Sequence, residues 1–310
     1  MTDGKAGMNS QCLGLAELLG LEPEMKVVSP RFPWSCLPPQ LWLFPFCAQS
    51  SQESGISPPW PSILIATGRQ TVALSIAIKK ASMGTTKTIQ IQNPQCSISK
   101  FDLVLAPEHD QLSGDNVIST IGALHRVNPD RLSLARRHFA KLYSSLPRPL
   151  IAVLIGGSNR RLRMDTTDAT RLGEQLVSGA KHSGSGLLIT ASRRTDPKVI
   201  SSLKNALGDV QYSFWDGQGD NPYFGMLALA DGFVVTKDSI NMVSEAAATG
   251  KPVHIFELNG KSKKFDLFHQ GMRDARITRP FLGKFEKWQY DQPNDFKKIA
   301  MEIRKRVGID

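Results

Sequence analysis

The sequence predicts an α/β protein of two domains that face a cleft, each built on a parallel sheet flanked by helices. Three observations support this class. Apolar runs of strand length alternate with helical patterns along most of the chain. Polar turns follow several of these runs, as expected where parallel strands end at one rim of a sheet. The chain has 310 residues, which suits two domains of about 150 residues each better than one core.

The composition is that of a globular protein with an excess of positive charge. Hydrophobic residues make up 41%, and 38 Lys and Arg outnumber 28 Asp and Glu to give a formal charge of +10. This charge favours anionic partners such as phosphates, nucleic acid or an acidic membrane surface. We expect no nucleic acid, because no basic run with interleaved aromatics, zinc spacing or named nucleic-acid motif occurs.

Cysteine usage and hydropathy predict a cytoplasmic protein. The four cysteines form no C-x-x-C pair, which favours free thiols in a reducing cytosol. The most apolar short run, residues 41–48, is interrupted by Pro45 and falls far short of the roughly 20 residues that span a bilayer. We also find no signal-peptide pattern before the polar residues 3–5.

The first domain is expected to cover residues 1–147. It opens on Asp3-Gly-Lys-Ala-Gly7 and a helical pattern, which together look like a strand-to-helix loop without its strand. Either the start lies too late, or the sheet is built without that strand. Residues 24–29 then read as a short strand. Farther on, regular alternation predicts a helix over 71–81 and strands over 62–66, 86–91 and 101–105.

Polar turns after these three strands supply candidate catalytic residues, since the turns should share one rim of the sheet. His109 is a candidate general base, because neighbouring Glu108 and Asp110 would raise the pKa of its imidazole. A His in a polar loop is nevertheless more often a solvated or hydrogen-bonded structural residue. Glu108 and Asp3 are the other candidates for a base.

Residues 30–61 form a Pro-, Ser- and Trp-rich excursion that carries Trp34, Trp42 and Trp60. A loop of this length without regular structure is usually functional or mobile. One interpretation is an interfacial patch that touches lipid or a partner, because Trp and Phe suit the headgroup region. The other, which we favour, is that the rings pack on their own domain, because exposed apolar patches are uncommon.

The second domain is expected to cover residues 148–310. A fully buried strand over 150–155 leads into Gly156, Gly157 and Ser158, where missing side chains would let a phosphate approach the backbone. A strand over 187–191 ends at Arg193 and Arg194, one of which could clamp a diphosphate. A last amphipathic helix over 295–307 is a candidate to cross back onto the first domain.

The most informative stretch follows a strand over 233–235. Ser239 can cap a helix that stops at Gly250, so free backbone N–H groups and the positive end of the helix dipole gather at residues 238–241. Asn241 and Glu245 are four residues apart and share one helix face. That pattern suits a nucleotide, with phosphate beside Asp238 and Ser239 and ribose on Glu245. The alternative is an ordinary strand-to-helix connection with a solvated Glu.

Two similar α/β halves, the Gly-Gly turn and the Ser-Glu helix resemble the glycosyltransferase architecture of two Rossmann-like domains called GT-B. Residues 243–253, Val-Ser-Glu-Ala-Ala-Ala-Thr-Gly-Lys-Pro-Val, are similar to the donor-site helix of the bacterial transferase that adds N-acetylglucosamine to the lipid-linked peptidoglycan precursor. This resemblance implies that Glu245 binds the ribose of the donor.

A nearly full-length resemblance is to the mitochondrial-fission (elongate-mitochondria) family of plants and its bacterial relatives. Its marker segments resemble Asp3-Gly-Lys-Ala-Gly7 with Gln11, Ile155-Gly-Gly157, Thr190-Ala-Ser-Arg-Arg-Thr195, Asp220-Asn-Pro-Tyr223 and Thr236–Glu245. The length and the absence of a targeting region suggest a bacterial member. The plant proteins are implicated in recruiting a dynamin-related fission factor to mitochondria, which implies binding and not catalysis.

Two functions remain open from the sequence. The first is a GT-B-like glycosyltransferase that uses a nucleoside-diphosphate sugar in envelope or lipid-linked glycan synthesis, cytoplasmic or peripheral on the inner face of the cytoplasmic membrane. Its partners would include a lipid-linked acceptor or an anionic membrane surface. Without an Asp-x-Asp signature, we expect no obligatory metal or cofactor. The second is a non-catalytic nucleotide-sugar-binding or scaffold protein of the mitochondrial-fission family type.

Overall fold

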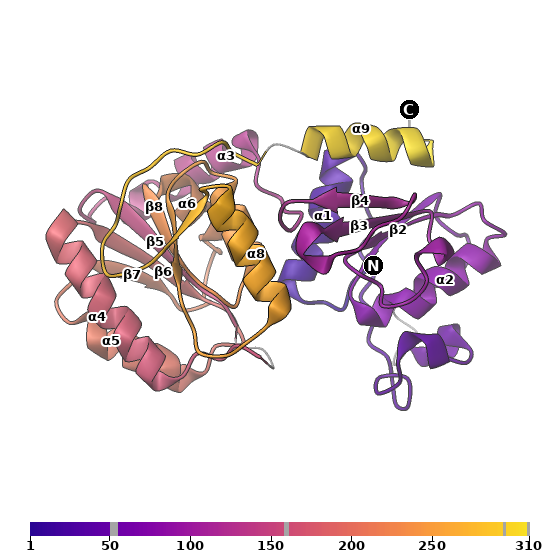
Figure 1. Cartoon of the computed structure of the whole chain (residues 1–310), viewed down its shortest axis with the longest axis horizontal. Coiled ribbons are helices and arrows are strands. Elements are labelled where there is room, and N and C mark those ends of the chain that lie inside the picture. Colours follow the sequence, from indigo (N-terminus) through magenta and orange to yellow (C-terminus); the bar gives the residue numbers. More distant parts are fainter. Residues whose placement is uncertain (50–54, 158–160, 294–295, 309–310) are drawn as a thin grey trace. The chain divides into compact units, whose positions relative to one another are not determined.

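A computed structural model describes residues 1–49, 55–157, 161–293 and 296–308 and divides the chain into two compact units (Figure 1). Unit 1 comprises Met1–Arg126 with Asn294–Asp310, and unit 2 comprises Val127–Pro293. Each unit contains a sheet of parallel strands with helices packed on it. The predicted class, α/β with parallel sheets flanked by helices, is therefore confirmed.

Unit 1 holds a four-stranded sheet in the order β1-β2-β3-β4, with every neighbouring pair parallel. Apolar residues of α1 and α9 pack together on one face, and α2 covers the other face. The elements are α1 (Ala6–Leu18), β1 (Ile63–Thr67), α2 (Val72–Ala81), β2 (Lys87–Ile91), β3 (Leu103–Pro107), β4 (Val117–Thr120) and α9 (Phe296–Val307).

The first two residues lie beside β1 in extended conformation. Met1 N donates to Ile65 O at 2.7 Å and Thr67 N donates to Met1 O at 3.1 Å, the pattern of a parallel pair. On the other side, Thr2 pairs with Val27 in a single bridge. The strand that we predicted over residues 24–29 is therefore reduced to that bridge, since only Thr2 lies beside it to accept and donate its hydrogen bonds.

The excursion over residues 30–61 packs its tryptophans against unit 1. Trp42 is buried, and Trp34 and Trp60 are partly buried against the same core beside α2. Two short 3-10 helices, Pro39–Leu41 and Pro45–Ala48, lie within it. The interpretation that these rings pack on their own domain is confirmed for the three tryptophans, whereas five large apolar residues of the excursion are exposed: Phe32, Leu41, Leu43, Phe44 and Phe46.

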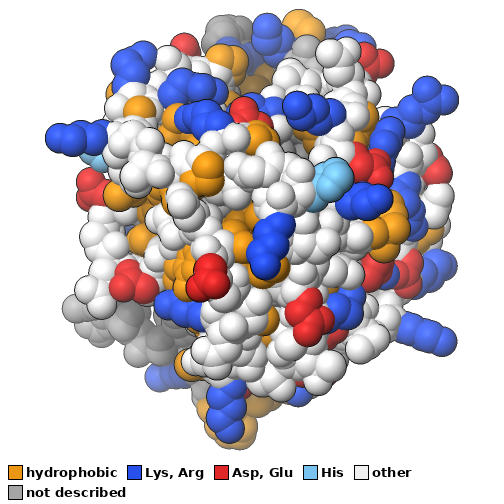
Figure 2. Space-filling view, turned by 90° about the vertical axis from the view of Figure 1, so that its left-hand side faces the viewer, with side chains coloured by type: hydrophobic (Ala, Val, Ile, Leu, Met, Phe, Trp, Pro, Cys, Tyr) orange, Lys and Arg blue, Asp and Glu red, His pale blue; other side chains and the backbone are white. Residues whose placement is uncertain are grey.

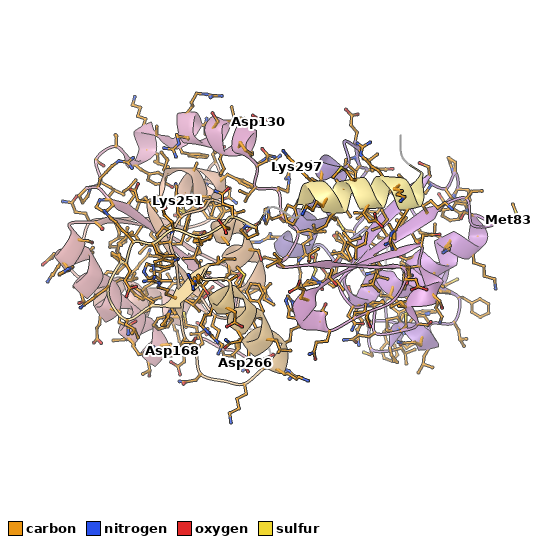
Figure 3. All side chains as sticks on the ribbon, turned by 45° about the horizontal axis from the view of Figure 1, so that its top comes forward. Met83, Asp130, Asp168, Lys251, Asp266 and Lys297 are labelled. Carbon is orange, nitrogen blue, oxygen red and sulfur yellow. The ribbon has the colours of Figure 1, made fainter. Side chains whose placement is uncertain are left out.

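Unit 2 holds a six-stranded parallel sheet in the order β10-β9-β8-β5-β6-β7. Helices α4 and α5 cover one face, and α3, α6, α7 and α8 cover the other, so Asp168 on α4 and Asp266 on α8 mark opposite layers (Figure 3). The strands are β5 (Leu150–Ile155), β6 (Gly186–Ala191), β7 (Tyr212–Trp215), β8 (Gly232–Thr236), β9 (Val253–Phe256) and β10 (Thr278–Pro280). The helices are α3 (Pro129–Phe139), α4 (Thr166–Ser183), α5 (Pro197–Leu207), α6 (Tyr223–Leu229), α7 (Ile240–Ala247) and α8 (Lys263–Asp274).

The units divide at different positions from the expected boundary between residues 147 and 148. Helix α3 belongs to unit 2 because its apolar side packs against α6, with Arg131 stacked over the Phe224 ring at 5.2 Å. The last helix, α9, belongs to unit 1, where Ile299 and Ile303 join the α1 residue Leu15 in one core. Both assignments depend on long-range packing that periodicity alone does not specify.

The carboxyl end of α6 is held by three cations. Lys251 Nζ donates to Ala228 O at 3.1 Å, Arg136 donates to the same carbonyl, and Arg148 Nη1 lies 3.5 Å from Leu229 O. Positive groups stabilise the negative end of a helix dipole. Burial, with the two arginines beside it, lowers the pKa of Lys251 (Figure 3) to about 8. These contacts fix the position of α6, which begins at Tyr223.

No helix in the described ranges is both long enough and apolar enough to cross a membrane.

Two buried histidines of unit 2 are held in the neutral form. His254 lies between Phe233 O, 3.1 Å from Nδ1, and the N–H of Glu286, which donates to Nε2 at 3.0 Å. His269 Nε2 lies 2.8 Å from Lys237 O. Burial lowers the pKa of both imidazoles, that of His269 to about 4, because a charged ring loses its hydration.

The stability of unit 2 should therefore fall with pH below about 6.5, the pKa of His in an unfolded chain. The unfolded chain binds the proton first as the pH falls. The contribution of His269 to the free energy of unfolding is therefore complete above pH 6.5, and it decreases by about 3 kcal/mol when the pH reaches 4. Urea unfolding between pH 6.5 and 5 should show a shallower loss for His269→Gln, which keeps a donor for Lys237 O. Equal pH dependence in the two proteins would contradict this origin.

Candidate functional site

The strand order of unit 2 reverses between the neighbouring strands β5 and β8. From β5 the chain proceeds through β6 and β7 toward one edge, whereas β8, β9 and β10 build the other side. Open α/β sheets bind ligands where the strand order reverses in this way. Three predicted turns follow strands at this rim, namely those at residues 156–157, 192–195 and 238–241.

Hydrogen bonds among buried groups join the carboxyl ends of β5, β6 and β8. Gly156 N donates to Thr236 Oγ1 at 2.7 Å, and the same hydroxyl donates to Asp238 Oδ1 at 2.6 Å. Thr195 Oγ1 donates to Gly156 O at 3.1 Å. The ends of β5, β6 and β8 are thus tied through two threonines that the sequence analysis did not single out, although both lie in segments that resemble family markers.

Gly156 and Gly157 are required by their neighbours. A Cβ on Gly156 would lie 2.4 Å from Asp238 Oδ1, and one on Gly157 would lie 2.6 Å from Ser192 Oγ and 2.8 Å from Arg194 Nε. In the structure the space of the missing side chains belongs to Asp238, Ser192 and Arg194, and the approach of a phosphate to this turn stays a prediction. Ser158 lies outside the described residues.

Asp238 carries a buried carboxyl in the turn between β8 and α7. It is only 6% exposed, and within the described residues its Oδ2 has no hydrogen-bond partner. Burial raises the pKa of Asp238, while the Thr236 hydrogen bond and the charge of Arg194 act in the opposite direction. Arg193 and Arg194 are both exposed, but Arg194 is the one whose Nε lies beside Gly157.

Ser239 and Asn241 stand at the start of α7. The predicted cap is confirmed, since Ser239 Oγ accepts a hydrogen bond from Met242 N at 3.4 Å. Asn241 is half-buried in the first turn. The helix ends at Ala247, and Gly250 follows with a positive φ of 74°, a conformation that glycine adopts without strain.

Glu245 is paired with Tyr223 across two helices. Glu245 on α7 is only 6% exposed, and it accepts a hydrogen bond from the hydroxyl of Tyr223 at the start of α6. The alternative of a solvated Glu is therefore wrong. Burial and the neighbouring carboxylate raise the pKa of Tyr223 well above its ordinary value. Sequence reasoning missed Tyr223 as a site residue, although Asp220-Asn-Pro-Tyr223 was a recognisable signal.

The predicted bases lie in unit 1, at the ends of β1 and β3. Asp3 forms an ion pair with Lys5 and lies near Gly68, which follows β1 with a φ of 92°. Glu108 is exposed, and His109 beside it is buried, only 8% exposed. His109 is therefore not a solvated loop residue, and its catalytic role stays a prediction. Across the described ranges, no three His, Cys, Asp or Glu side chains converge as metal ligands would.

Comparison with known families and sequences gives one consistent match. A family model described as Mitochondrial fission ELM1 matches residues 6–307. The mitochondrial fission protein ELM1 of Arabidopsis thaliana is 32% identical over 275 residues, covering 80% of this chain but only 64% of the relative, so the chain spans less than two thirds of that protein. An uncharacterized protein of Rickettsia prowazekii is 28% identical over 290 residues, covering 81% of each chain.

Solved structures with the same fold have the GT-B architecture. A UDP-GlcNAc 2-epimerase from Neisseria meningitidis bound to UDP-GlcNAc is 14% identical with a TM-score of 0.52 and covers 98% of both chains. MurG from Acinetobacter baumannii is 13% identical with a TM-score of 0.51 and covers 99% of this chain and 91% of its own. MnaA from S. aureus, solved with UDP, is 12% identical with a TM-score of 0.53 and covers 100% of this chain and 96% of its own. Identities this low establish the fold alone, and that fold is GT-B-like.

The close contact of Gly156 with Asp238 can be tested by substitution. Gly156→Ala should destabilise unit 2 by about 1–3 kcal/mol, because the added methyl meets a buried and hydrogen-bonded carboxyl. Gly271→Ala in α8 is the matched control, since nothing lies within 4 Å of its Cβ, and it should be neutral or stabilising by about 0.5–1 kcal/mol. Urea unfolding gives both values, and equal stability of the two variants would disprove the crowding.

Proposed function

We propose, on the premise that this chain belongs to the mitochondrial fission ELM1 family and has a GT-B-like fold, that unit 2 binds a nucleoside-diphosphate sugar. The observation that carries the proposal is the buried Glu245 carboxylate, which Tyr223 orients on a helix that follows β8, where the strand order reverses between β5 and β8. A carboxylate so held suits the hydroxyls of a ribose. Two solved structures with this fold contain UDP-GlcNAc and UDP, which supports the same ligand class here.

In this proposal the diphosphate meets positive and donor groups at the rim. The start of α7, with Ser239 and Asn241, offers backbone N–H groups and the positive end of a helix dipole. Arg194 beside Gly157 would add a charge-assisted hydrogen bond.

We further propose sugar transfer as the reaction. An acceptor hydroxyl would attack the anomeric carbon, the bond from that carbon to the diphosphate would break, and the acceptor proton would pass to a base. Arg194 and the N–H groups of α7 would stabilise the leaving diphosphate, and such preorganised dipoles are usually the largest catalytic contribution. His109, Glu108 and Asp3 are the proposed bases, with no obligatory metal or cofactor.

The second candidate function is nucleotide-sugar binding without turnover, as in a scaffold protein. The Arabidopsis thaliana relative, which bears the name of a mitochondrial fission protein, favours this alternative. Calorimetry with UDP, ADP, GDP and TDP separates the cases when it is combined with assays of donor hydrolysis and transfer. Binding with turnover supports the transferase, binding without turnover supports the scaffold, and no binding of any diphosphate contradicts both.

Substitution of the buried pair tests the site directly. Glu245→Ala should weaken nucleotide binding by about 1–3 kcal/mol, roughly 5- to 150-fold, because a hydrogen bond to a charged group is lost. Tyr223→Phe should weaken it less, because the carboxylate remains but is less firmly oriented. Glu174→Ala, an exposed Glu on α4, is the control. Calorimetric affinity unchanged by Glu245→Ala would remove Glu245 from the site.

We also propose contact with an anionic membrane surface or a lipid-linked acceptor. The supporting observation is the set of exposed apolar side chains in the excursion of unit 1, which we call the apolar patch: Phe32, Leu41, Leu43, Phe44 and Phe46, of which Phe32 is 79% exposed and Phe44 77% exposed. Over the face shown in Figure 2, Lys and Arg side chains are spread among Asp and Glu, and the net charge of the chain is +10. A weak, distributed attraction to anionic lipid would accompany insertion of the patch.

The membrane proposal is tested on the exposed residues. Changing Phe32, Leu43 and Phe44 jointly to Ser should weaken binding to vesicles containing phosphatidylglycerol at least tenfold, since each apolar side chain withdrawn from water contributes about 1.5–3 kcal/mol. Joint change of three exposed leucines of unit 2, Leu134, Leu142 and Leu282, to Ser is the matched control. Vesicle sedimentation that is the same for both triple variants would rule out the patch as a lipid contact.

A further inference from the structure

The start of α8 in unit 2 is strongly basic. Lys263 and Lys264 are the first residues of the helix, and Lys261 lies just before its N-cap residue. Cations are disfavoured at this end, because the positive end of the helix dipole lies there, whereas Arg273 in the last turn is favourably placed. The lysines therefore act against the stability of their own helix. Such departures from local preference are typical of functional sites.

A second basic segment of unit 2 lies against this one. Arg161 and Arg163 are both exposed, whereas Leu162 between them is buried. Gly260 brings the two segments into contact, since a Cβ at this position would lie 2.2 Å from Arg161 O and 3.1 Å from Leu162 Cδ2. The φ of Gly260 is 125°, a conformation that favours glycine. The two arginines are therefore added to the positive charge of the lysines.

The acidic groups of the same loops already have partners. Lys237 Nζ lies 3.0 Å from Glu257 Oε2 and 3.1 Å from Asp266 Oδ1, and Asp266 is the acidic residue in the first turn of α8 (Figure 3). Asp165 caps α4 by accepting a hydrogen bond from Asp168 N at 2.8 Å. These pairings leave the lysines at the start of α8 as an excess of positive charge.

Ser262 occupies the N-cap position of α8 without capping the helix. Its side chain is buried, with the residue only 4% exposed, and it forms no cap hydrogen bond with the first turn. Within the described ranges, its hydroxyl has no other hydrogen-bond partner. The first N–H groups of a helix have no carbonyl before them in the helix and point outward. A buried hydroxyl and backbone donors therefore converge among the cations.

We propose that the start of α8 is a binding site for the phosphate monoester group of a ligand. The Ser262 hydroxyl and the N–H groups of residues 263–265 would donate to phosphate oxygens, because helix starts favour this group. Lys261, Lys263 and Arg163 would supply charge-assisted contacts. The arrangement around one buried hydroxyl favours a single phosphate group over an extended polyanion such as nucleic acid. This inference goes beyond the proposed nucleotide site and does not require it.

Amide chemical shifts test the location of the site. Titration of the isotope-labelled full chain with inorganic phosphate at low ionic strength should shift the amide signals of residues 263–265. Joint Lys261→Glu and Lys263→Glu should weaken the affinity about tenfold or more, because charge-assisted contacts are lost. Joint change of Lys284 and Lys287, exposed lysines after β10, to Glu is the control with the same change in charge. Unmoved signals at 263–265, or equal weakening by both pairs, would overturn the proposal.

Substitution of Ser262 tests the site without a change in charge. Ser262→Ala should weaken phosphate binding by about 2- to 10-fold, because one neutral donor is lost, and Ser262→Thr should keep the affinity. Without phosphate, the unfolding midpoint of Ser262→Ala should equal that of the parent chain, because no cap hydrogen bond is broken. A lowered midpoint with unchanged phosphate affinity would make Ser262 an ordinary cap and overturn its role.

Two further probes separate the sources of the phosphate group. Binding of glycerol phosphate, without sedimentation on vesicles containing phosphatidic acid, would identify a soluble ligand. Sedimentation on these vesicles that is lost on joint Lys261→Glu and Lys263→Glu would identify a lipid headgroup. Either result supports the site, and binding of neither probe would overturn it. Displacement of phosphate by UDP would also overturn a separate site, whereas a chain that ignores UDP but binds phosphate would contradict only the nucleotide proposal.

Discussion

The hydroxyl of Thr236 joins the two strands on either side of the strand-order reversal in unit 2. It accepts the N–H of Gly156 at the end of β5 and donates to Asp238 after β8. A buried backbone N–H without a partner is costly, and this single side chain provides one while orienting a buried carboxyl. The close approach requires glycine at 156, and Thr195 closes the arrangement from β6. The shape of the candidate site depends on these contacts.

The pairing of Glu245 with Tyr223 extends this arrangement to two helices. Each residue lies in the first turns of its helix or close behind them, and each helix follows a strand end of the same sheet. The cations at the far end of α6 hold that helix in place from the opposite side. Burial makes a shared hydrogen bond necessary for both side chains, because neither a carboxylate nor a phenol is tolerated without a partner in an apolar core. The result is an oriented carboxylate, which is what binding a sugar hydroxyl demands.

Parallel sheets covered on both faces impose a second constraint, which is visible in both units. In unit 2 the rule is met by two separate apolar layers, and even the histidines are held neutral within them. In unit 1, residues of both helical layers, Cys12 and Ala16 of α1 and Ile78 of α2, line a groove of about 530 Å³ beside β1. Phe32 and Phe44 are large apolar side chains that remain exposed to solvent, whereas the tryptophans of the same excursion pack against the core of unit 1.

Local sequence alone determined most of the strands and helices, the Ser239 cap and the gathering of residues 156–157, 192–195 and 238–241 at one rim, because periodicity, capping and strand-end turns are short-range properties. It also indicated Glu245 through its spacing and a family resemblance. Only the tertiary structure decided that Tyr223 holds Glu245, that Asp238 fills the space left by Gly156, and that α3 belongs to unit 2 and α9 to unit 1. These outcomes depend on contacts between residues far apart in the chain, and hydrophobic patterning records that a face is buried without recording against what it is buried.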